Sequence, residues 1–328
     1  VAIQQREPTM RRASQTNRRQ FLQAAGASAA ALLAAPRAGS VLAAEQAAYT
    51  VGIYTRPWSA LDYRAAFDAI AEAGFKHAGL MTITLPGRTL VIQQDTPLEE
   101  AARIGQEAKS RGLSIPSVYG GGIPVQKSLE EGIAGMRRLI DACAAAGAKS
   151  LLMGGIGNEK LAAIYYQAIA ECCDYAAEKN LPVSVKPHGG LNATGSECRK
   201  WIEKVGHKNF DLWYDPGNIF FYSKGQLNPV DDAATVDGLV RTGMCIKDFD
   251  IVERDGKPTP DVSLTPGTGR VDFLAVLARL RRGGFTRGHL VIECLTRTKP
   301  DDPKALIAEA KKARRYVERL AAQATAGS

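Results

Sequence analysis

From Tyr49 to the C-terminus, short apolar runs alternate with longer amphipathic stretches. The short runs have the length and residue types of buried strands, and the longer stretches repeat apolar residues at helical spacing. Alternation of this kind is typical of βαβ units with a parallel sheet. The apolar runs predict eight strands, at residues 50–54, 77–83, 114–119, 150–154, 183–186, 212–215, 244–247 and 290–293.

Eight amphipathic stretches lie between or after these strands. Gly74 and Gly147 stand where a helix should stop before the next strand begins. Eight such units predict a closed (β/α)8 TIM barrel formed by a single domain, with a doubly wound open sheet as the alternative. No GxGxxG follows the first strand, which disfavours dinucleotide binding. The predicted helices are residues 60–73, 97–111, 129–146, 159–179, 195–205, 230–239, 273–282 and 303–322.

The start of the chain has the pattern of a targeting segment. Residues 17–23, Asn-Arg-Arg-Gln-Phe-Leu-Gln, precede a weakly apolar run at 24–35 and small residues near Ala43. This pattern resembles a twin-arginine export signal, and an Ala-rich core helix is the alternative interpretation. We therefore expect residues 1–43 to be a signal peptide recognised by the twin-arginine translocase. The barrel would occupy residues 44–328 and be periplasmic or secreted, without a stable membrane span, because the apolar run is too short for one.

The charge of the chain depends on this segment. Residues 1–43 contain six arginines and one glutamate, so their removal lowers the net charge from +8 to +3. The remainder has no stripe of basic residues interleaved with aromatic ones. We therefore expect no nucleic-acid partner.

The six cysteines show no CxxC spacing, so neither a zinc ribbon nor a thioredoxin motif is indicated. Most lie within predicted helices or strands, where cysteine is typically a small buried residue. An oxidising compartment would permit a disulfide, and the sequence leaves that question open. The cysteines are Cys143, Cys172, Cys173, Cys198, Cys245 and Cys294.

Polar clusters end the predicted strands in the second half of the chain. In an α/β barrel, all strands finish at one rim, so these residues are expected to meet in one pocket. The clusters are Lys186-Pro-His188, Asp215-Pro-Gly-Asn218, Ile246-Lys247-Asp248, Pro266-Gly-Thr-Gly269 and Val291-Ile-Glu293.

These clusters, in this order, resemble the xylose isomerase-like barrel superfamily over residues 50–320. The superfamily contains sugar isomerases and epimerases and shares its fold with the type IV (AP endonuclease family 2) endonucleases. The longer phrase at residues 186–195 is similar to one in exported, twin-arginine members. The resemblance implies a TIM barrel that acts on a small-molecule carbohydrate.

The resemblance also implies a divalent metal such as Mn²⁺, held by Glu, Asp, His and Glu at the ends of strands five to eight. In this chain, those positions are Lys186, Asp215, Cys245 and Glu293. A lysine ammonium cannot ligate a metal, and a thiolate suits hard ions poorly. Asn218 replaces a further histidine that is usual in the family. Only Asp215 and Glu293 are therefore expected metal ligands, and the cofactor is left open.

Charge suggests an alternative in which the Lys186 ammonium pairs with Asp215 and Glu293 and replaces the metal. Isomerisation next to a carbonyl needs a base and an electrophile. We assign Glu293 as the base, Lys186 and Lys247 to the oxyanion, and His188 as the acid. Two other interpretations stay open: a shifted metal site of His188, Asp215 and Glu293, and a purely structural ion cluster.

Three further residues near strand ends are assigned to substrate binding: Asn218, Asp248 and Trp58. Trp58 could stack on a sugar, although core packing is the default for a tryptophan. Residues 215–218 could instead form a simple turn. The glycine-rich segment 266–269 could bind an anion through backbone N–H groups or be a plain loop.

The function expected from these residues is an exported sugar isomerase or epimerase that abstracts a proton next to a carbonyl. A lyase or hydrolase acting on an oxidised (keto) glycoside shares the first step and is an alternative. A non-catalytic carbohydrate-binding barrel is another. A nuclease is disfavoured, because only four histidines are present and three of them lie outside the polar clusters.

Overall fold

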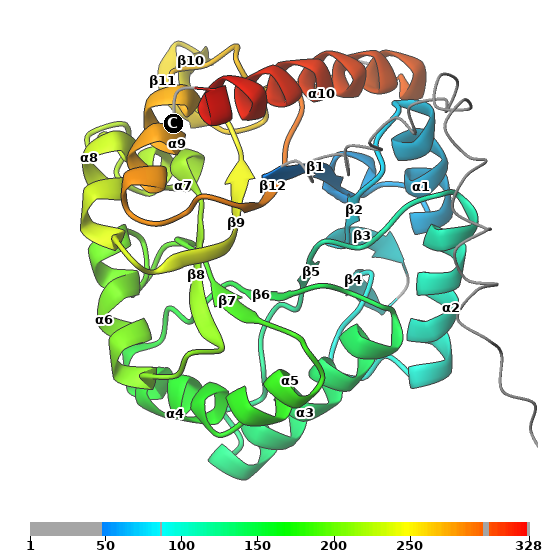
Figure 1. Ribbon diagram of the computed structural model, residues 1–328, viewed down its shortest axis with the longest axis vertical. Helices are drawn as coiled ribbons and strands as arrows, with labels where there is room; N and C mark the ends of the chain where they lie inside the picture. The colour runs from blue at the N-terminus through cyan, green and yellow to red at the C-terminus, as the bar shows by residue number, and fades with distance from the viewer. Residues whose placement is uncertain (1–47, 86, 298–301, 327–328) are drawn as a thin grey trace, which may run out of the picture. The chain divides into compact units, whose positions relative to one another are not determined.

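The computed structural model describes residues 48–85, 87–297 and 302–326, so the predicted signal peptide lies outside the described residues. Eight parallel strands form one sheet in the order β2-β1-β12-β9-β8-β7-β6-β5, surrounded by helices (Figure 1). The strands are β1 (Tyr49–Tyr54), β2 (Ala78–Gly79), β5 (Val118–Tyr119), β6 (Leu151–Met153), β7 (Val183–Val185), β8 (Phe210–Tyr214), β9 (Val240–Ile246) and β12 (Gly288–Ile292).

The two ends of this sheet are joined by a short seam between β2 and β5. Leu80 and Val118 form a parallel bridge just beyond β2. The Leu80 N–H donates to the Ser117 carbonyl at 2.9 Å, and the Tyr119 N–H donates to the Leu80 carbonyl at 2.8 Å. These bonds close the sheet into a barrel. The predicted TIM barrel is therefore confirmed, and the alternative of an open sheet was wrong.

Amphipathic helices cover the outside of the ring, each with a buried apolar face toward the strands. Several begin at a side-chain cap, and α6 has a full capping box between Thr194 and Glu197. The helices are α1 (Tyr63–Glu72), α2 (Leu98–Ser110), α3 (Leu129–Ala145), α4 (Glu159–Ala170), α5 (Cys173–Glu178), α6 (Gly195–Val205), α7 (Pro216–Tyr222), α8 (Pro229–Ala233), α9 (Phe273–Arg282) and α10 (Pro303–Ala326), with 3-10 helices at Arg56–Trp58 and Ala234–Val236.

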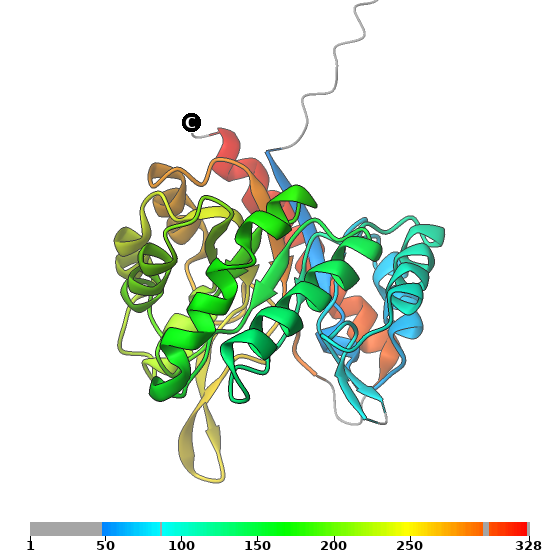
Figure 2. The ribbon, with the colours of Figure 1, turned by 90° about the horizontal axis from the view of Figure 1, so that it is seen from below.

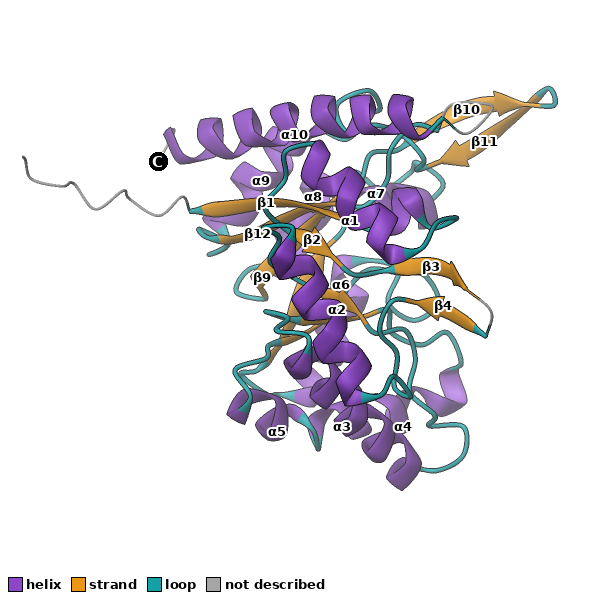
Figure 3. Cartoon of the chain, turned by 90° about the vertical axis from the view of Figure 1, so that its right-hand side faces the viewer, coloured by secondary structure: helices purple, strands orange, loops and turns teal. Residues whose placement is uncertain are grey.

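Two antiparallel hairpins, neither of them predicted, stand at the same end of the barrel (Figures 2 and 3). The first pairs β3 (Thr82–Leu85) with β4 (Arg88–Leu90), and the second pairs β10 (Asp250–Arg254) with β11 (Lys257–Asp261). The predicted strand at 77–83 was wrong in extent, because the chain leaves the barrel after Leu80 and pairs with its own hairpin. The second hairpin turns at Asp255-Gly256, both with positive φ, a residue pair that signals such turns.

The predicted helix at 159–179 was also wrong, since it divides into α4 and α5. At the break, the Cys172 N–H bonds the Ile169 carbonyl at 3.0 Å, three residues back rather than four. Such a local tightening leaves the apolar periodicity unchanged, so the sequence pattern does not reveal it.

The predicted helix at 230–239 ends early, because Asp237 leaves the helical conformation and Gly238 has a φ of 78°. β9 therefore starts at Val240, before the predicted residue 244. Residues 215–218, which could have formed a simple turn, instead start helix α7. Asp at the N-cap and Pro at the first helical position favour this start.

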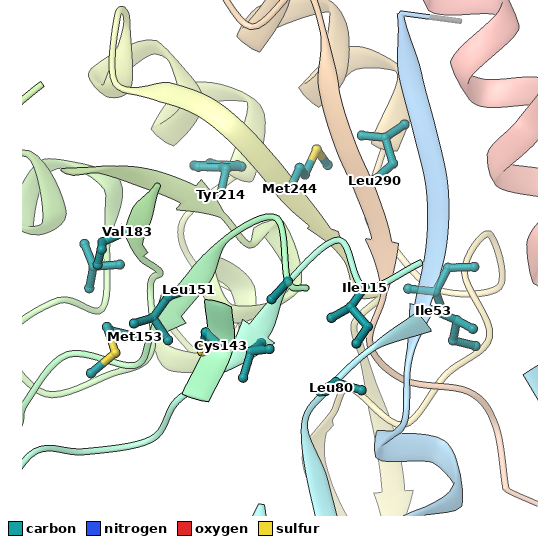
Figure 4. Packing of buried hydrophobic residues seen from close by; sticks show 14 of the residues in the cluster. Ile53, Leu80, Ile115, Cys143, Leu151, Met153, Val183, Tyr214, Met244 and Leu290 are labelled. Carbon is teal, nitrogen blue, oxygen red and sulfur yellow. The ribbon is translucent and has the colours of Figure 1, made fainter. Parts of the chain in front are cut away.

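Alternation along the strands divides the core in two. Outward-facing residues such as Ile53, Leu80, Val183 and Leu290 belong to the large cluster shared with the helices (Figure 4). Inward-facing residues fill the barrel itself. This inner cluster contains Tyr54, Met81, Leu152, Trp213, Cys245 and Val291.

All six cysteines are free and buried, so the structure contains no disulfide among them, a question that the sequence left open. Of the helices in the described part of the chain, none is both long and apolar enough to cross a membrane.

Candidate functional site

Four charged residues follow four neighbouring strands and turn into the same end of the barrel. Lys186 follows β7, Asp215 follows β8, Lys247 follows β9 and Glu293 follows β12. None of these side chains is more than 2% exposed. The structure thus brings together three residues to which the sequence analysis gave catalytic roles, Lys186, Lys247 and Glu293, and Asp215, which was expected to pair with Lys186.

The four side chains form a ring in which positive and negative groups alternate. Lys186 Nζ lies 3.2 Å from Asp215 Oδ2 and 2.6 Å from Glu293 Oε2. Lys247 Nζ lies 3.1 Å from Asp215 Oδ2 and 2.6 Å from Glu293 Oε1. Each ammonium therefore bridges both carboxylates, which compensates the cost of burying four charges.

Asn218, assigned to substrate binding, lies against this ring. Its Oδ1 accepts a hydrogen bond from Lys247 Nζ at 2.9 Å, and its Nδ2 donates to the Pro187 carbonyl at 2.6 Å. Its backbone N–H donates to Asp215 Oδ1 at 3.0 Å, the N-cap bond of α7. The first turn of α7 thereby orients Lys247 and Asp215.

Arg56 is a site residue that the sequence analysis missed. It follows β1, and its guanidinium contacts Glu293 Oε1. Its side chain is 38% exposed, so it reaches from solvent to the buried ring. The available signal was its position two residues after the predicted strand at 50–54, where a charged residue points to the rim of a barrel.

Electrostatics keep the ring ionised. Burial alone would raise the pKa of Glu293, but the charges of Lys186, Lys247 and Arg56 outweigh it and hold that pKa well below its usual range. Burial would lower the pKa of Lys186, yet nearby groups, Glu293 foremost, hold it well above its usual range. Glu293 is therefore an anion of low basicity.

His188 lies apart from the ring, at the mouth of the barrel. Its ring centroid is 5.9 Å from that of Tyr119 and 6.2 Å from that of Tyr222. Although its side chain reaches solvent, the surrounding protein and the charges of Lys186 and Lys247 lower its pKa to about 4. The imidazole is therefore neutral at pH 7 and can accept a proton.

A cavity of about 560 Å³ opens above the ring and is polar on several sides. Lys186, Glu293 and His188 line it, so the catalytic candidates face one space. The β3–β4 hairpin contributes hydroxyl groups to the wall. The remaining lining residues are Arg56, Ser59, Met81, Thr82, Ile83, Thr84, Thr89, Tyr119 and Arg297.

Asp248, also assigned to substrate binding, is buried beneath the segment 266–269. Its carboxylate accepts five backbone N–H groups at 2.8–3.1 Å. A Cβ at Gly269 would lie 2.5 Å from Asp248 Oδ1, which explains the glycine. The N–H groups of this segment thus bind Asp248. The donors are Phe249, Gly267, Thr268, Gly269 and Val271.

Trp58, the third residue assigned to substrate binding, is 2% exposed and does not line the cavity above the ring. It lines a separate, mainly apolar pocket together with Pro57 and Leu61. The structure therefore places Trp58 in packing contacts beside the site.

The implied metal positions do meet, but their chemistry does not fit a divalent ion. Asp215, Cys245 and Glu293 can bring ligand atoms within 4.8 Å of one another, and in the described part of the chain this is the only such group, without His188. The Lys186 ammonium bridges the two carboxylates of that group. Burial also raises the pKa of the Cys245 thiol well above its usual range, so it is protonated.

Comparison with known families agrees with this architecture. The sequence profile of the xylose isomerase-like TIM barrel family (AP endonuclease family 2) matches residues 67–318. The chain belongs to this family. None of the curated proteins resembles it significantly in sequence.

Several solved structures share the xylose isomerase-like barrel. A D-psicose 3-epimerase from Clostridium cellulolyticum H10 is 14% identical with a TM-score of 0.64, covering 83% of this chain and 99% of its own. A D-allulose 3-epimerase from Methylomonas sp. is 17% identical with a TM-score of 0.63, and the match covers 83% of this chain and 96% of the epimerase. A 3-keto-D-glucoside 4-epimerase from E. coli is 17% identical with a TM-score of 0.57, and the match covers 81% of this chain and 99% of that enzyme. At these identities, the likeness shows the fold.

Proposed function

We propose that this protein is an enzyme that abstracts a proton next to the carbonyl of a sugar, as an epimerase or isomerase, with an ammonium group in place of the metal. The observation that carries the proposal is the position of Lys186 at the floor of the cavity. Its ammonium uses two N–H donors on Asp215 and Glu293. A lysine ammonium has three donors, so one is left for a substrate oxygen.

In this proposal, the sugar carbonyl oxygen binds Lys186, and His188 takes the proton from the adjacent carbon. The electron pair of the broken C–H bond moves to the carbonyl oxygen, and Lys186 stabilises the resulting enediolate. Return of the proton to carbon completes the exchange. We assign the base to His188 rather than Glu293, because a neutral imidazole accepts a proton more readily than a carboxylate whose pKa is strongly lowered.

The proposal is tested by incubating keto- and aldosugars with the protein in D₂O and following the C–H signals by NMR. Wild type should incorporate deuterium. Lys186→Met should slow incorporation by about 100-fold or more, since the oxyanion loses its partner. Lys160→Met, which removes an exposed lysine on α4, should behave as wild type. Lys186→Arg, which keeps the charge, distinguishes misplacement of the cation from failure to fold.

The same assay tests whether a metal is needed. Pre-treatment of wild type with EDTA should leave the rate unchanged, and metal analysis should find no stoichiometric ion. Loss of activity in EDTA with recovery in Mn²⁺ would contradict the ammonium proposal. Release of an aglycone from a keto-glycoside would instead assign the lyase reaction, which shares the first step.

We also propose that the protein is exported through the twin-arginine pathway, on the basis of Arg18-Arg19 and the apolar run that follows. Its substrate would then be a sugar outside the cytoplasm.

A further inference from the structure

The charged residues of the cavity are unequal in sign. Among the described residues that line it, Arg56, Lys186 and Arg297 are cations, and Glu293 is the only carboxylate. Below the cavity, Lys247 and Asp215 carry equal and opposite charges. The described part of the site therefore holds more positive charge than its own carboxylates compensate.

The carboxylate of Glu293 cannot accept further donors and so cannot compensate the additional positive charge of the cavity. Its Oε2 accepts from Lys186 at 2.6 Å and from the Cys245 thiol at 3.2 Å. Its Oε1 contacts Lys247 at 2.6 Å and also Arg56. Both oxygens are occupied by donors. A neutral sugar would leave the excess positive charge in place, whereas an anionic ligand would offset it.

The two arginines line the same cavity and follow neighbouring strands. Arg56 follows β1 and Arg297 lies beyond β12, and these strands are neighbours that pair in parallel up to Ile53 and Ile292. Arg297 is exposed, and within the described residues its guanidinium donates to Ser59 Oγ at a long 3.4 Å, so it is little constrained there. A guanidinium presents a planar fork of N–H donors that matches the oxygens of a carboxylate or phosphate.

The rest of the cavity suits the sugar itself. Thr82, Thr84 and Thr89 of the β3–β4 hairpin and Ser59 supply hydroxyl groups, which can pair with sugar hydroxyls. A volume of about 560 Å³ lies in the range of small-molecule sites. The cavity thus combines a polar, neutral wall with a cationic one.

We propose that the substrate is an acidic sugar, carrying a carboxylate or a phosphate monoester that Arg56 and Arg297 bind while the carbonyl faces Lys186. This inference rests on the proposed function for the position of the carbonyl. Binding of the acidic group by Arg56 and Arg297, the arginine subsite, can be tested separately by measuring affinity.

The test is isothermal titration calorimetry of the full chain with D-glucuronate, D-glucose 6-phosphate and neutral D-glucose. An acidic sugar should bind at least about ten-fold more tightly than glucose, since a charge-assisted contact is gained. That advantage should shrink as NaCl is added, because salt screens exposed charges. Preference for glucuronate assigns a carboxylate, and preference for glucose 6-phosphate assigns a phosphate. Equal affinity for all three would overturn the proposal.

Arg297→Gln is the decisive variant, because Arg297 is exposed and lies outside the buried ring. It should weaken binding of the acidic sugar by roughly ten-fold and leave glucose unaffected. Arg287→Gln is the matched control: it removes an exposed arginine just before β12, at the opposite end of that strand. Equal effects of the two variants would show that only the overall charge matters and would overturn the arginine subsite.

Failure of this inference and failure of the proposed function give different results. If acidic sugars bind through Arg297 but no sugar incorporates deuterium, proton abstraction is refuted and the acidic subsite is kept. If neutral sugars incorporate deuterium and acidic ones show no preference, the subsite is refuted and proton abstraction is kept.

Discussion

Lys186 shows how one substitution changes a site without changing its fold. It occupies a position at which the family resemblance implies a metal-ligating glutamate, and its ammonium lies between the two remaining carboxylates, Asp215 and Glu293. In this chain, a covalently attached cation therefore lies between the two carboxylates. Together with Lys247 and Arg56, it keeps the basicity of Glu293 low, because a carboxylate bonded to several cations holds a proton weakly.

The pH dependence tests the role of His188. If the neutral imidazole is the base, the rate of deuterium incorporation should rise with pH through about 4 and stay level above it, because protonation below that pKa removes the acceptor. His188→Asn should lose this inflection and slow the reaction by about 100-fold or more. A rate that falls as pH rises above 4 would show instead that the imidazolium acts as an acid. Circular dichroism at each pH verifies that the barrel stays folded.

At the scale of elements, residues at the strand ends have two different roles, in the site and in holding a loop. The charged ring is formed by Lys186, Asp215, Lys247 and Glu293. Asp248, the next residue after Lys247, instead points to the loop at 266–269 and accepts hydrogen bonds from its N–H groups. Neighbouring residues of an extended segment point to opposite sides, which explains how Lys247 and Asp248 separate. One strand end therefore supplies the site and anchors the adjacent loop.

The stabilising role of Asp248 predicts a large effect on folding. Asp248→Ala should lower the free energy of unfolding by about 3–5 kcal/mol, because five backbone N–H groups lose their buried partner. Asp250→Ala is the control: among the described residues, the Asp250 carboxylate accepts from the Ile251 N–H and the exposed Arg270, so its loss should cost about 1 kcal/mol or less. Urea unfolding followed by fluorescence gives both values. Similar costs would contradict the anchoring role.

At the scale of the whole molecule, the described residues from 48 to 326 form one compact unit. The hairpins β3–β4 and β10–β11 both rise from the end at which the strands finish (Figure 3). Cavity, buried ring and His188 lie at that end, as in other barrels of this type. Loops and hairpins can therefore change substrate contacts there without disturbing the inner core.

Export is a prediction about the whole chain. Replacing Arg18 and Arg19 by lysine should retain the protein in the cytoplasm, since the paired arginines define the signal. Fractionation of cells that express the wild type and the double variant measures the effect. Arg11→Lys and Arg12→Lys, upstream of the motif, form the control and should leave export intact. Equal distribution of the two double variants would contradict the twin-arginine assignment.

The sequence by itself determined the barrel and most of its site, because strand and helix periods are local and every parallel strand of a barrel ends at one rim. Lys186, Asp215, Lys247 and Glu293 follow from that rule, and the structure brings all four together. The sequence also showed that a lysine, Lys186, stands at a position where the family resemblance implies a metal-ligating glutamate.

Only the tertiary structure decided which partners each charge has. The contact of Arg56 with Glu293 spans almost the whole barrel sequence, and no local pattern links them. The pKa of Glu293 is lowered because cations from other strands outweigh the effect of its burial. The pKa of His188 is lowered by the surrounding protein and by the charges of Lys186 and Lys247. The excess of positive charge above the ring has the same origin, because it is a sum over side chains that only the closed barrel brings together.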